Sequence, residues 1–386
     1  MTNRQATQAR AALLRRLCEV VSWPESRMPQ YERQLAADIL LGLLRTASVE
    51  VRARCAQGLV RVHEAPKALL RYLARDDFQV ARDLLENGVG LDDSDLIATV
   101  RAGVTQHWLA IARRRGLNEA VTDALCQTND VAVIEALLRN NLARLSVQGV
   151  DLILAKTRQA THLAPLLALR PEVKPTQALI MFWWVGFDVR VQIVRRFAAD
   201  RGALIGELGD IFALAAAEGW SDPDVRKALQ TIERRQRNRA AAQRSPFGSL
   251  ENAIAVGVER GADRALLDEI GHLAGVRPAT AAQIFSDPGG EAIGVLCKAV
   301  GLRRPHLLML WRALRRPSGD PATTDNALGR TVFVYDTLAT MKAQTVLRYW
   351  NWSFTADAAA FIDDNGDDDN ASQARRNAIL LFQRNM

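Results

Sequence analysis

The sequence has few of the residues from which covalent or metal-bound frameworks are built. Its four cysteines lie far apart and include no Cys-x-x-Cys pair, which excludes a disulfide-dense scaffold and a zinc ribbon. Its five histidines have no metal-ligand spacing to one another, to a cysteine or to a carboxylate. We therefore expect a reduced, cytoplasmic protein that uses no metal and no cofactor.

Long hydrophobic runs are also absent. The most hydrophobic stretch, residues 178–187 (ALIMFWWVGF), is ten residues long, whereas a membrane-spanning helix needs about 20. Arginines interrupt the first 17 residues, and no small-residue cleavage site follows them. The sequence predicts neither a membrane span nor a secretory signal.

Catalytic signatures are missing as well. There is no phosphate-binding loop, nucleophile elbow or dinucleotide fingerprint. If Gly366 in the acidic run is placed at the sixth position of a calcium loop, Phe361 and Ser372 occupy positions that require carboxylates. We therefore expect no calcium site and no catalytic residue, and the sequence favours binding over chemistry.

What the chain does contain is an ordinary balance for a soluble globular protein. Hydrophobic residues make up 48% and charged residues 24% of 386 residues, and the net charge is +7. This length exceeds the usual single-domain core of about 100–200 residues. We expect two or three structural units or one elongated array, with only a weak preference for anionic partners.

An internal repeat is the strongest signal. Each copy opens on a large apolar residue with a nonpolar or small residue four positions later, and successive copies begin 29, 28, 25 and 30 residues apart. The fifth copy matches less well than the others. The copies begin at Val51, Val80, Trp108, Val133 and Leu163.

A second helical pattern lies between the copies, in residues 68–73, 96–100, 121–125 and 150–154, where apolar residues recur three and four apart. Helix pairs of fewer than thirty residues cannot bury both faces alone and must stack on their neighbours. The sequence therefore predicts an all-α fold, a HEAT-like α-solenoid followed by a second helical unit. The alternative is the background self-similarity of any helical chain rich in Leu, Ala and Arg.

The ends of these helices also carry signals. Residues 92–94 (Asp-Asp-Ser) are typical of a helix N-cap, and Gly88 and Gly116 are suited to the left-handed conformation that follows a helix end.

Four motifs in the repeat region resemble a known family. They are Asp76-Asp77-x-x-Val80-Ala81, Leu91-Asp92-x-x-Asp95-Leu96, His107-x-x-Ala110-Ile111-Ala112-x-Arg114 and Ala136-Leu137-x-x-Asn140-Asn141. They are similar to a bacterial family of short HEAT-like repeats catalogued as domain of unknown function twenty-three thirty-six. The resemblance covers residues 35–171 and extends more loosely to residue 316. It implies an all-helical array in a bacterial cytoplasm and implies no reaction.

The second half continues as helices. Pro and Gly after a basic stretch predict a boundary near residue 247, and Gly275 and Gly301 mark two copies of a 26-residue duplication. We assign residues 1–34 to an N-terminal helix and linker, 35–220 to the repeat array, 221–247 to a projecting basic helix, 248–317 to the duplicated unit, and 318–386 to C-terminal helices with an acidic linker.

Arginine clusters are the candidate binding residues. Solvated helix faces carry similar clusters, so this reading competes with a purely structural one. On the helix at 303–316 we expect Arg312, Arg315 and Arg316 to lie opposite the apolar face. The candidates are Arg113, Arg114, Arg115, Arg234, Arg235, Arg237, Arg239, Arg303, Arg304, Arg312, Arg315 and Arg316.

Residues 269–285 have the spacing of a DNA-reading helix-turn-helix. Their second helix, however, offers few side chains able to reach bases, and the duplication explains the same spacing.

The leading hypothesis is a non-enzymatic interaction protein that presents a helical-repeat surface to a protein partner in bacterial regulation. Two alternatives remain: binding of a nucleic-acid backbone through the arginines, and sensing of a small nucleotide.

Overall fold

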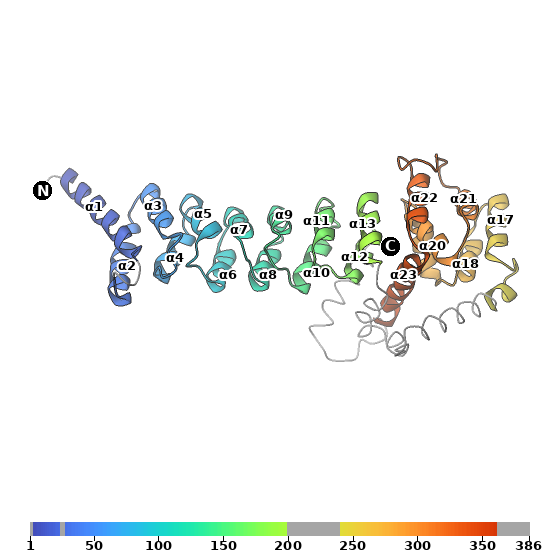
Figure 1. Ribbon diagram of the computed structural model, residues 1–386, viewed down its shortest axis with the longest axis horizontal. Helices are drawn as coiled ribbons and strands as arrows, with labels where there is room; N and C mark the ends of the chain where they lie inside the picture. Colours follow the sequence, from blue (N-terminus) through green and yellow to red (C-terminus); the bar gives the residue numbers. More distant parts are fainter. Residues whose placement is uncertain (1–2, 24–27, 199–239, 361–386) are drawn as a thin grey trace. The chain divides into compact units, whose positions relative to one another are not determined.

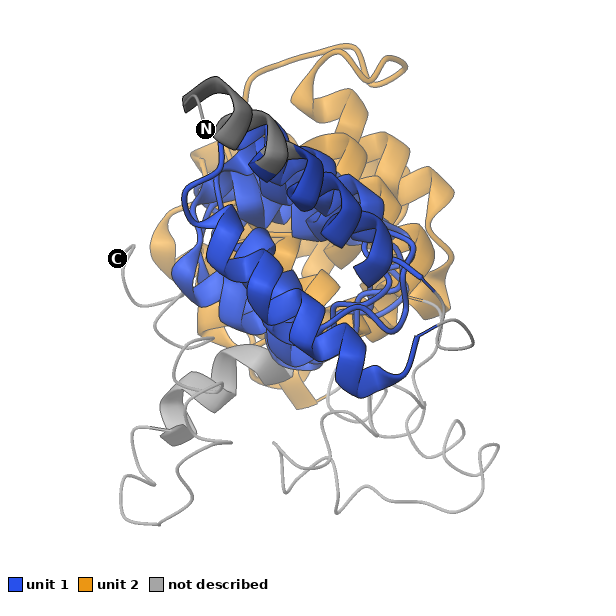
Figure 2. Cartoon of the chain, turned by 90° about the vertical axis from the view of Figure 1, so that its left-hand side faces the viewer, with its two compact units in different colours: residues 1–173 blue, residues 174–386 orange. Residues whose placement is uncertain are grey.

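The computed structural model describes residues 3–23, 28–198 and 240–360, and every regular element in these ranges is an α-helix (Figure 1). The predicted all-α class is confirmed. The chain divides into two compact units, residues 1–173 and 174–386, which are coloured separately in Figure 2.

Unit 1 is a succession of short helices joined by short loops. Those from the third helix onward have 7 to 11 residues, about two to three turns each. Its helices are α1 (Asn3–Val21), α2 (Gln30–Leu44), α3 (Val49–Leu59), α4 (Lys67–Ala74), α5 (Phe78–Asn87), α6 (Asp93–Ala102), α7 (Thr105–Ala112), α8 (Glu119–Gln127), α9 (Val131–Arg139), α10 (Val147–Lys156) and α11 (Leu163–Leu169).

The helices of unit 1 form two rows (Figure 1). In one row, α3, α5, α7, α9 and α11 each pack on the next; in the other, α2 packs on α4, α6 on α8, and α8 on α10. The five predicted copies lie in the first row, and the second helical pattern lies in α4, α6, α8 and α10. The predicted solenoid-like stacking is confirmed, and the finer HEAT-like assignment stays a prediction.

The core of unit 1 lies between these rows. Leu84, Ile111, Leu137 and Leu167, one from each of four successive helices of the first row, have no exposed surface. Burying a leucine side chain stabilises a fold by about 1.5–3 kcal/mol. Each helix pair therefore depends on its neighbours to cover its apolar face.

The residues predicted to lie at helix ends do so, and the predicted backbone conformation is wrong for one of them. Asp92 caps α6 in a reciprocal capping box with Asp95, and Gly116 has φ +72°. Gly88 was predicted to be left-handed, and this is wrong because its φ is −66°. A Cβ at Gly88 would lie 2.5 Å from the Leu84 carbonyl oxygen, so close backbone approach explains this glycine.

Unit 2 is built around a helix that is buried on nearly all sides. Residues 291–297 of α20 are all buried, and α20 packs on α19, α21, α22 and α23. The described helices of this unit are α12 (Pro175–Met181), α13 (Phe187–Phe197), α17 (Leu250–Arg260), α18 (Arg264–Leu273), α19 (Pro278–Ser286), α20 (Glu291–Val300), α21 (Arg304–Ala313), α22 (Ala327–Thr337) and α23 (Thr340–Ala360).

The two predicted copies of the 26-residue duplication have the same local structure. Gly275 and Gly301 have φ +72° and +80°. The next amide in each copy bonds back over five residues, from Val276 to the Gly271 carbonyl and from Leu302 to the Cys297 carbonyl, both at 3.0 Å. Each copy is thus a helix, a left-handed C-cap and a second helix.

The boundary between the two units follows residue 173, inside the range 35–220 that the sequence assigns to one array. Most of the predicted basic helix at 221–247 lies outside the described residues. The division into five segments stays a prediction. In the described part of the chain, no helix is both long enough and apolar enough to cross a membrane.

Candidate functional site

Three side chains at the ends of neighbouring helices form a ladder in unit 1. Asn140, after α9, donates from Nδ2 to the carbonyls of Ala112 and Arg114 at 2.8 and 2.7 Å. Arg170, after α11, donates to the Asn140 carbonyl at 2.9 Å and also to that of Ala143. Arg114, after α7, donates to the Leu85 carbonyl at 3.3 Å and to that of Gly88.

This carbonyl ladder (Arg114, Asn140 and Arg170) satisfies backbone groups that a helix leaves unpaired. The last four carbonyls of any α-helix have no partner inside it. Arg114 is half-buried, and this burial lowers the pKa of its guanidinium. The predicted binding residue Arg114 therefore has a structural partner on the preceding helix of its row.

Arg113 and Arg115, on either side of Arg114 in the sequence, line a surface hollow instead. The hollow lies between α7 and α9, has a volume of about 630 Å³, and includes Arg113, Arg115 and Arg139 in its lining. We call it the basic hollow. Its other lining residues are Leu109, Ala132, Glu135, Ala136, Asn140, Asn141 and Leu142.

The arginines of the basic hollow differ in how they are paired. Arg139 lies 2.6 Å from Glu135, and Arg113 lies 3.8 Å from Glu86, with both arginine side chains more than half exposed. Arg115 is exposed, and no carboxylate of the described residues forms an ion pair with it. With one carboxylate and three guanidinium groups, the lining attracts anions, because arginine binds carboxylates and phosphates through paired hydrogen bonds.

Leu142 adds an apolar contact point to the basic hollow. Its side chain is 58% exposed, although most leucines of unit 1 are buried. Asn141 also lines the hollow, while the side-chain amide of Asn140 is already bonded to the backbone. The hollow thus combines positive charge, hydrogen-bonding amides and an exposed aliphatic side chain, which suits an acidic peptide segment carrying a hydrophobic residue.

The predicted arginines of unit 2 do not form one surface. Arg304 pairs with Asp336 at 3.5 Å, while Arg303 is exposed at the N-cap of α21 and Arg312 is exposed on that helix. Arg316 donates to the carbonyls of Phe285 and Asp287 at 2.9 and 2.6 Å, at the end of α19. Burial lowers the pKa of its guanidinium.

The expectation that Arg316 lies opposite the apolar face is therefore wrong. The helix ends at Ala313, and Arg315 takes a left-handed conformation with φ +52°. This turn brings the Arg316 guanidinium over the Trp311 ring, 5.1 Å from its centroid. The remaining predicted cluster, Arg234, Arg235, Arg237 and Arg239, lies outside the described residues.

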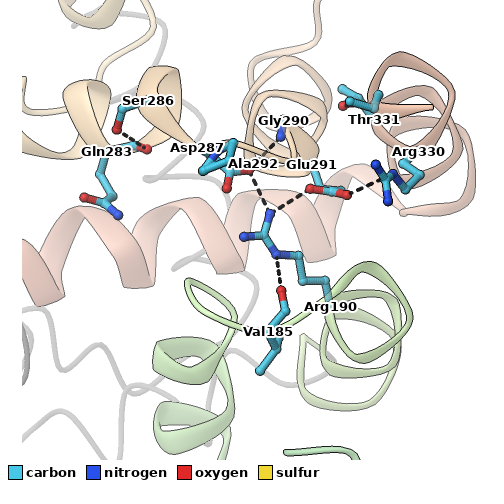
Figure 3. Close-up of polar contacts among 12 residues, drawn as sticks. Val185, Arg190, Gln283, Ser286, Asp287, Gly290, Glu291, Ala292, Arg330 and Thr331 are labelled. Carbon is cyan, nitrogen blue, oxygen red and sulfur yellow. Dashed lines mark hydrogen bonds and ion pairs between the residues drawn. The ribbon is translucent and has the colours of Figure 1, made fainter. Parts of the chain in front are cut away.

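Sequence analysis missed a group of charged residues in the interior of unit 2. Arg190 on α13 lies 2.9 Å from the Asp287 carboxylate and 2.7 Å from that of Glu291 (Figure 3). Arg330 on α22 lies 3.9 Å from the second oxygen of Glu291. We call Arg190, Asp287, Glu291 and Arg330 the buried charge cluster; its first three members are buried, the Arg330 side chain is 35% exposed, and the formal charges sum to zero.

The polar groups of the buried charge cluster are mostly satisfied by fixed partners. Asp287 also accepts the amides of Gly290 and Ala292 at 3.0 and 3.3 Å, which caps the start of α20. Arg190 donates through Nε to the Val185 carbonyl at 3.0 Å. The second carboxylate oxygen of Asp287 is buried and has no hydrogen-bond partner among the described residues. This arrangement joins α13, α20 and α22 and resembles a structural network more than an acid-base pair.

Unit 2 also has a surface hollow, which lies beside α13 and α22 and has a volume of about 550 Å³. Its lining includes Arg195, Phe187 and Phe333, and the Arg195 guanidinium lies 5.6 Å from the centre of the Phe333 ring. Sequence analysis did not single out these residues, because they belong to an ordinary amphipathic helix pattern.

No group of three or more His, Cys, Asp or Glu side chains in the described ranges is placed to hold a metal ion. His107 is buried and makes a structural contact, with Nε2 2.9 Å from the Asp76 carbonyl oxygen.

Comparison with known proteins identifies a family. A family model described as an uncharacterised protein conserved in bacteria (DUF2336) matches residues 80–348, from α5 to α23. The family predicted from the four motifs is confirmed, and the matched range extends further toward the C-terminus than the predicted one. No curated protein and no solved structure matches the chain.

Proposed function

From the premise that the chain belongs to the bacterial family DUF2336, we propose that it is a non-enzymatic interaction protein whose basic hollow binds an acidic segment of a protein partner. The family description carries no activity that could be transferred to this chain. The proposal places the protein in the bacterial cytoplasm in a regulatory role.

The observation that carries the proposal is the composition of the basic hollow. Arg115 is exposed without a carboxylate partner in the described part of unit 1, and Leu142 is an exposed leucine beside it in the same lining. An unpaired guanidinium gains more from a new carboxylate than one that is already paired. A partner segment with acidic residues around one aliphatic residue matches both features.

The scaffold around the basic hollow supports this use. Arg114 and Asn140 fasten the ends of α7 and α9 to their neighbours through backbone carbonyls. Arg113, Arg115 and Leu142 follow the ends of α7 and α9, and the hydrogen bonds of Arg114 and Asn140 hold the backbone of these two segments in place. A backbone fixed in this way reduces the conformational entropy that is lost on binding.

Binding of a nucleic-acid backbone is the competing function. Several predicted arginines already have partners within the protein: Arg114 and Arg316 donate to carbonyls, and Arg304 pairs with a carboxylate. This leaves fewer free guanidinium groups for phosphates and weakens the alternative.

The proposal is tested by affinity capture with matched variants. The tagged full-length chain is compared with the double variant Arg113→Glu/Arg115→Glu and with Arg312→Glu, which reverses an exposed arginine of unit 2. We expect one companion protein to be retained by the original chain and by Arg312→Glu. Charge reversal in the hollow should weaken its binding by about tenfold or more.

A duplex DNA titration accompanies the capture. Phosphate contacts would make DNA affinity fall steeply between low and physiological salt, with a slope that decreases in the double variant. That result, or a companion retained equally by all three proteins, would contradict the proposal.

A further inference from the structure

Two cysteines of unit 1 share one surface hollow. Cys18 on α1 and Cys55 on α3 both line a depression of about 610 Å³ between these helices. Cys18 is half-buried and therefore accessible, whereas Cys55 is only 2% exposed. Charged groups in the same lining are Arg15, Arg54 and Glu19.

Cys18 and Cys55 line the same hollow, on two helices that pack on each other. The neighbouring Cys55 thiol is the main cause that lowers the pKa of Cys18, and the Cys18 thiol together with burial raises the pKa of Cys55. Glu19 opposes the effect on Cys18 but is itself paired with Arg16 at 3.0 Å. Cys18 is therefore the first of the two to ionise.

The other two cysteines have a different environment. Cys126 is 3% exposed and Cys297 has no exposed surface, and burial raises the pKa of each to about 12. They behave as apolar core residues. An accessible thiolate beside a second thiol is the arrangement in which reversible cysteine oxidation occurs.

We propose that Cys18 and Cys55 form a peroxide-sensitive dithiol site, in which Cys18 is oxidised first and Cys55 resolves it to a disulfide that joins α1 to α3. This site is separate from the basic hollow, so the inference stands independently of the proposed function.

The reaction balances with one molecule of hydrogen peroxide. The Cys18 thiolate attacks one peroxide oxygen, an S–O bond forms, the O–O bond breaks, and the departing hydroxide takes up the proton released by Cys18. The Cys55 sulfur then attacks the Cys18 sulfenic acid, so that an S–S bond forms, the S–O bond breaks and a second water leaves with the Cys55 proton. Two thiols are oxidised and one peroxide is reduced to two waters.

The test is peptide mapping of the full-length chain. The reduced protein is treated with hydrogen peroxide, its remaining thiols are alkylated, and it is digested with trypsin. We expect residues 17–27 (LCEVVSWPESR) to be linked to residues 55–61 (CAQGLVR), with the link removed by dithiothreitol. Cys126→Ser and Cys297→Ser should leave this cross-link unchanged.

Single variants separate the two steps. In Cys55→Ser, Cys18 should stop at the sulfenic acid and react with dimedone, while Cys18→Ser should give no adduct at Cys55. In the untreated chain, iodoacetamide should label Cys18 at least about tenfold faster than Cys126. Equal labelling rates, a link to Cys126 or Cys297, or a cross-link that forms only in denaturant would overturn the proposal.

Discussion

Both units are all-helical in the ranges that the structure describes, but they join residues at very different distances along the chain. In unit 1, the carbonyl ladder links residues 26 to 30 positions apart. In unit 2, Arg190 pairs with Asp287 and Glu291 across 97 and 101 residues, and Tyr349 donates to the Thr176 carbonyl across 173. Unit 1 is thus held by nearest-neighbour contacts, and unit 2 by long-range ones.

This difference has an energetic consequence. When each repeat contacts only its neighbours, stability is approximately a sum of local terms. A buried network that joins distant helices makes those helices depend on one another. Both units nevertheless share one device: Arg114 in unit 1 and Arg316 in unit 2 each cap the carbonyl end of another helix. The common principle is the need to satisfy helix ends, and in both units the arginine does so over a similar chain distance, 29 residues from Arg114 to Leu85 and 31 from Arg316 to Phe285.

The largest effect is expected in unit 2, from Arg190→Met. The substitution leaves the Asp287 and Glu291 carboxylates buried next to an apolar side chain, and removing one partner of a buried ion pair costs about 3–5 kcal/mol. Urea unfolding monitored by tryptophan fluorescence, with Trp311 and Trp350 buried in this unit, measures the loss.

The control for this variant is Arg195→Met on the same helix, where the arginine is exposed. It should change stability by no more than about 0.5 kcal/mol. If the two variants lose the same stability, the buried charge cluster does not hold unit 2 together.

A smaller and more local effect is expected in unit 1, from Arg170→Met. Arg170 is buried, and its loss leaves the carbonyls of Asn140 and Ala143 without this donor, at a cost of about 1–3 kcal/mol. Hydrogen exchange should accelerate in α9 and α11 and remain unchanged in α3. Acceleration throughout unit 1 would contradict the nearest-neighbour description.

The smallest effect is expected from Asp92→Ala, which removes the cap of α6 and should cost about 1 kcal/mol at neutral pH. Hydrogen bonding from Ser94, and then from the Asp95 amide, holds the pKa of Asp92 below its ordinary value of 3.8. A lowered pKa in the folded state contributes stability above the unfolded-state pKa and loses it as the pH falls through the folded-state pKa.

The stability difference between the original chain and Asp92→Ala should therefore be constant from pH 7 to about pH 5 and shrink below about pH 4. Urea midpoints at each pH measure it. A difference that grows toward acid pH would contradict the assigned role of Asp92.

The repeat was predictable because its signals are local. Apolar spacing within a ten-residue window predicts a short amphipathic helix, and Asp92 and Gly116 mark helix ends by their own conformational preferences. The left-handed conformation was assigned to Gly88 incorrectly. A glycine can be required by close packing or by a positive φ, and the sequence alone does not distinguish these two reasons. The φ of −66° and the short distance to the Leu84 carbonyl, both known only from the structure, separate the two cases.

The residues of the proposed binding site were less predictable because the side chains of three adjacent arginines diverge. Arg113 and Arg115 reach the basic hollow, while Arg114 between them turns to the end of α5. The sequence contains no signal that distinguishes these directions. The buried charge cluster was missed for another reason: Arg190 and Asp287 are separated by 97 residues, and no short pattern connects them.

The direction of the carbonyl ladder has a consequence for how the chain is made. In each rung the donor follows its acceptors in the sequence, since Arg114 reaches back to α5, Asn140 to α7 and Arg170 to α9. During translation at about 5–20 residues per second, the ends of α5, α7 and α9 therefore wait roughly one to six seconds for the side chain that reaches them. These three helix ends would then be completed in order from the N-terminus as the chain is synthesised.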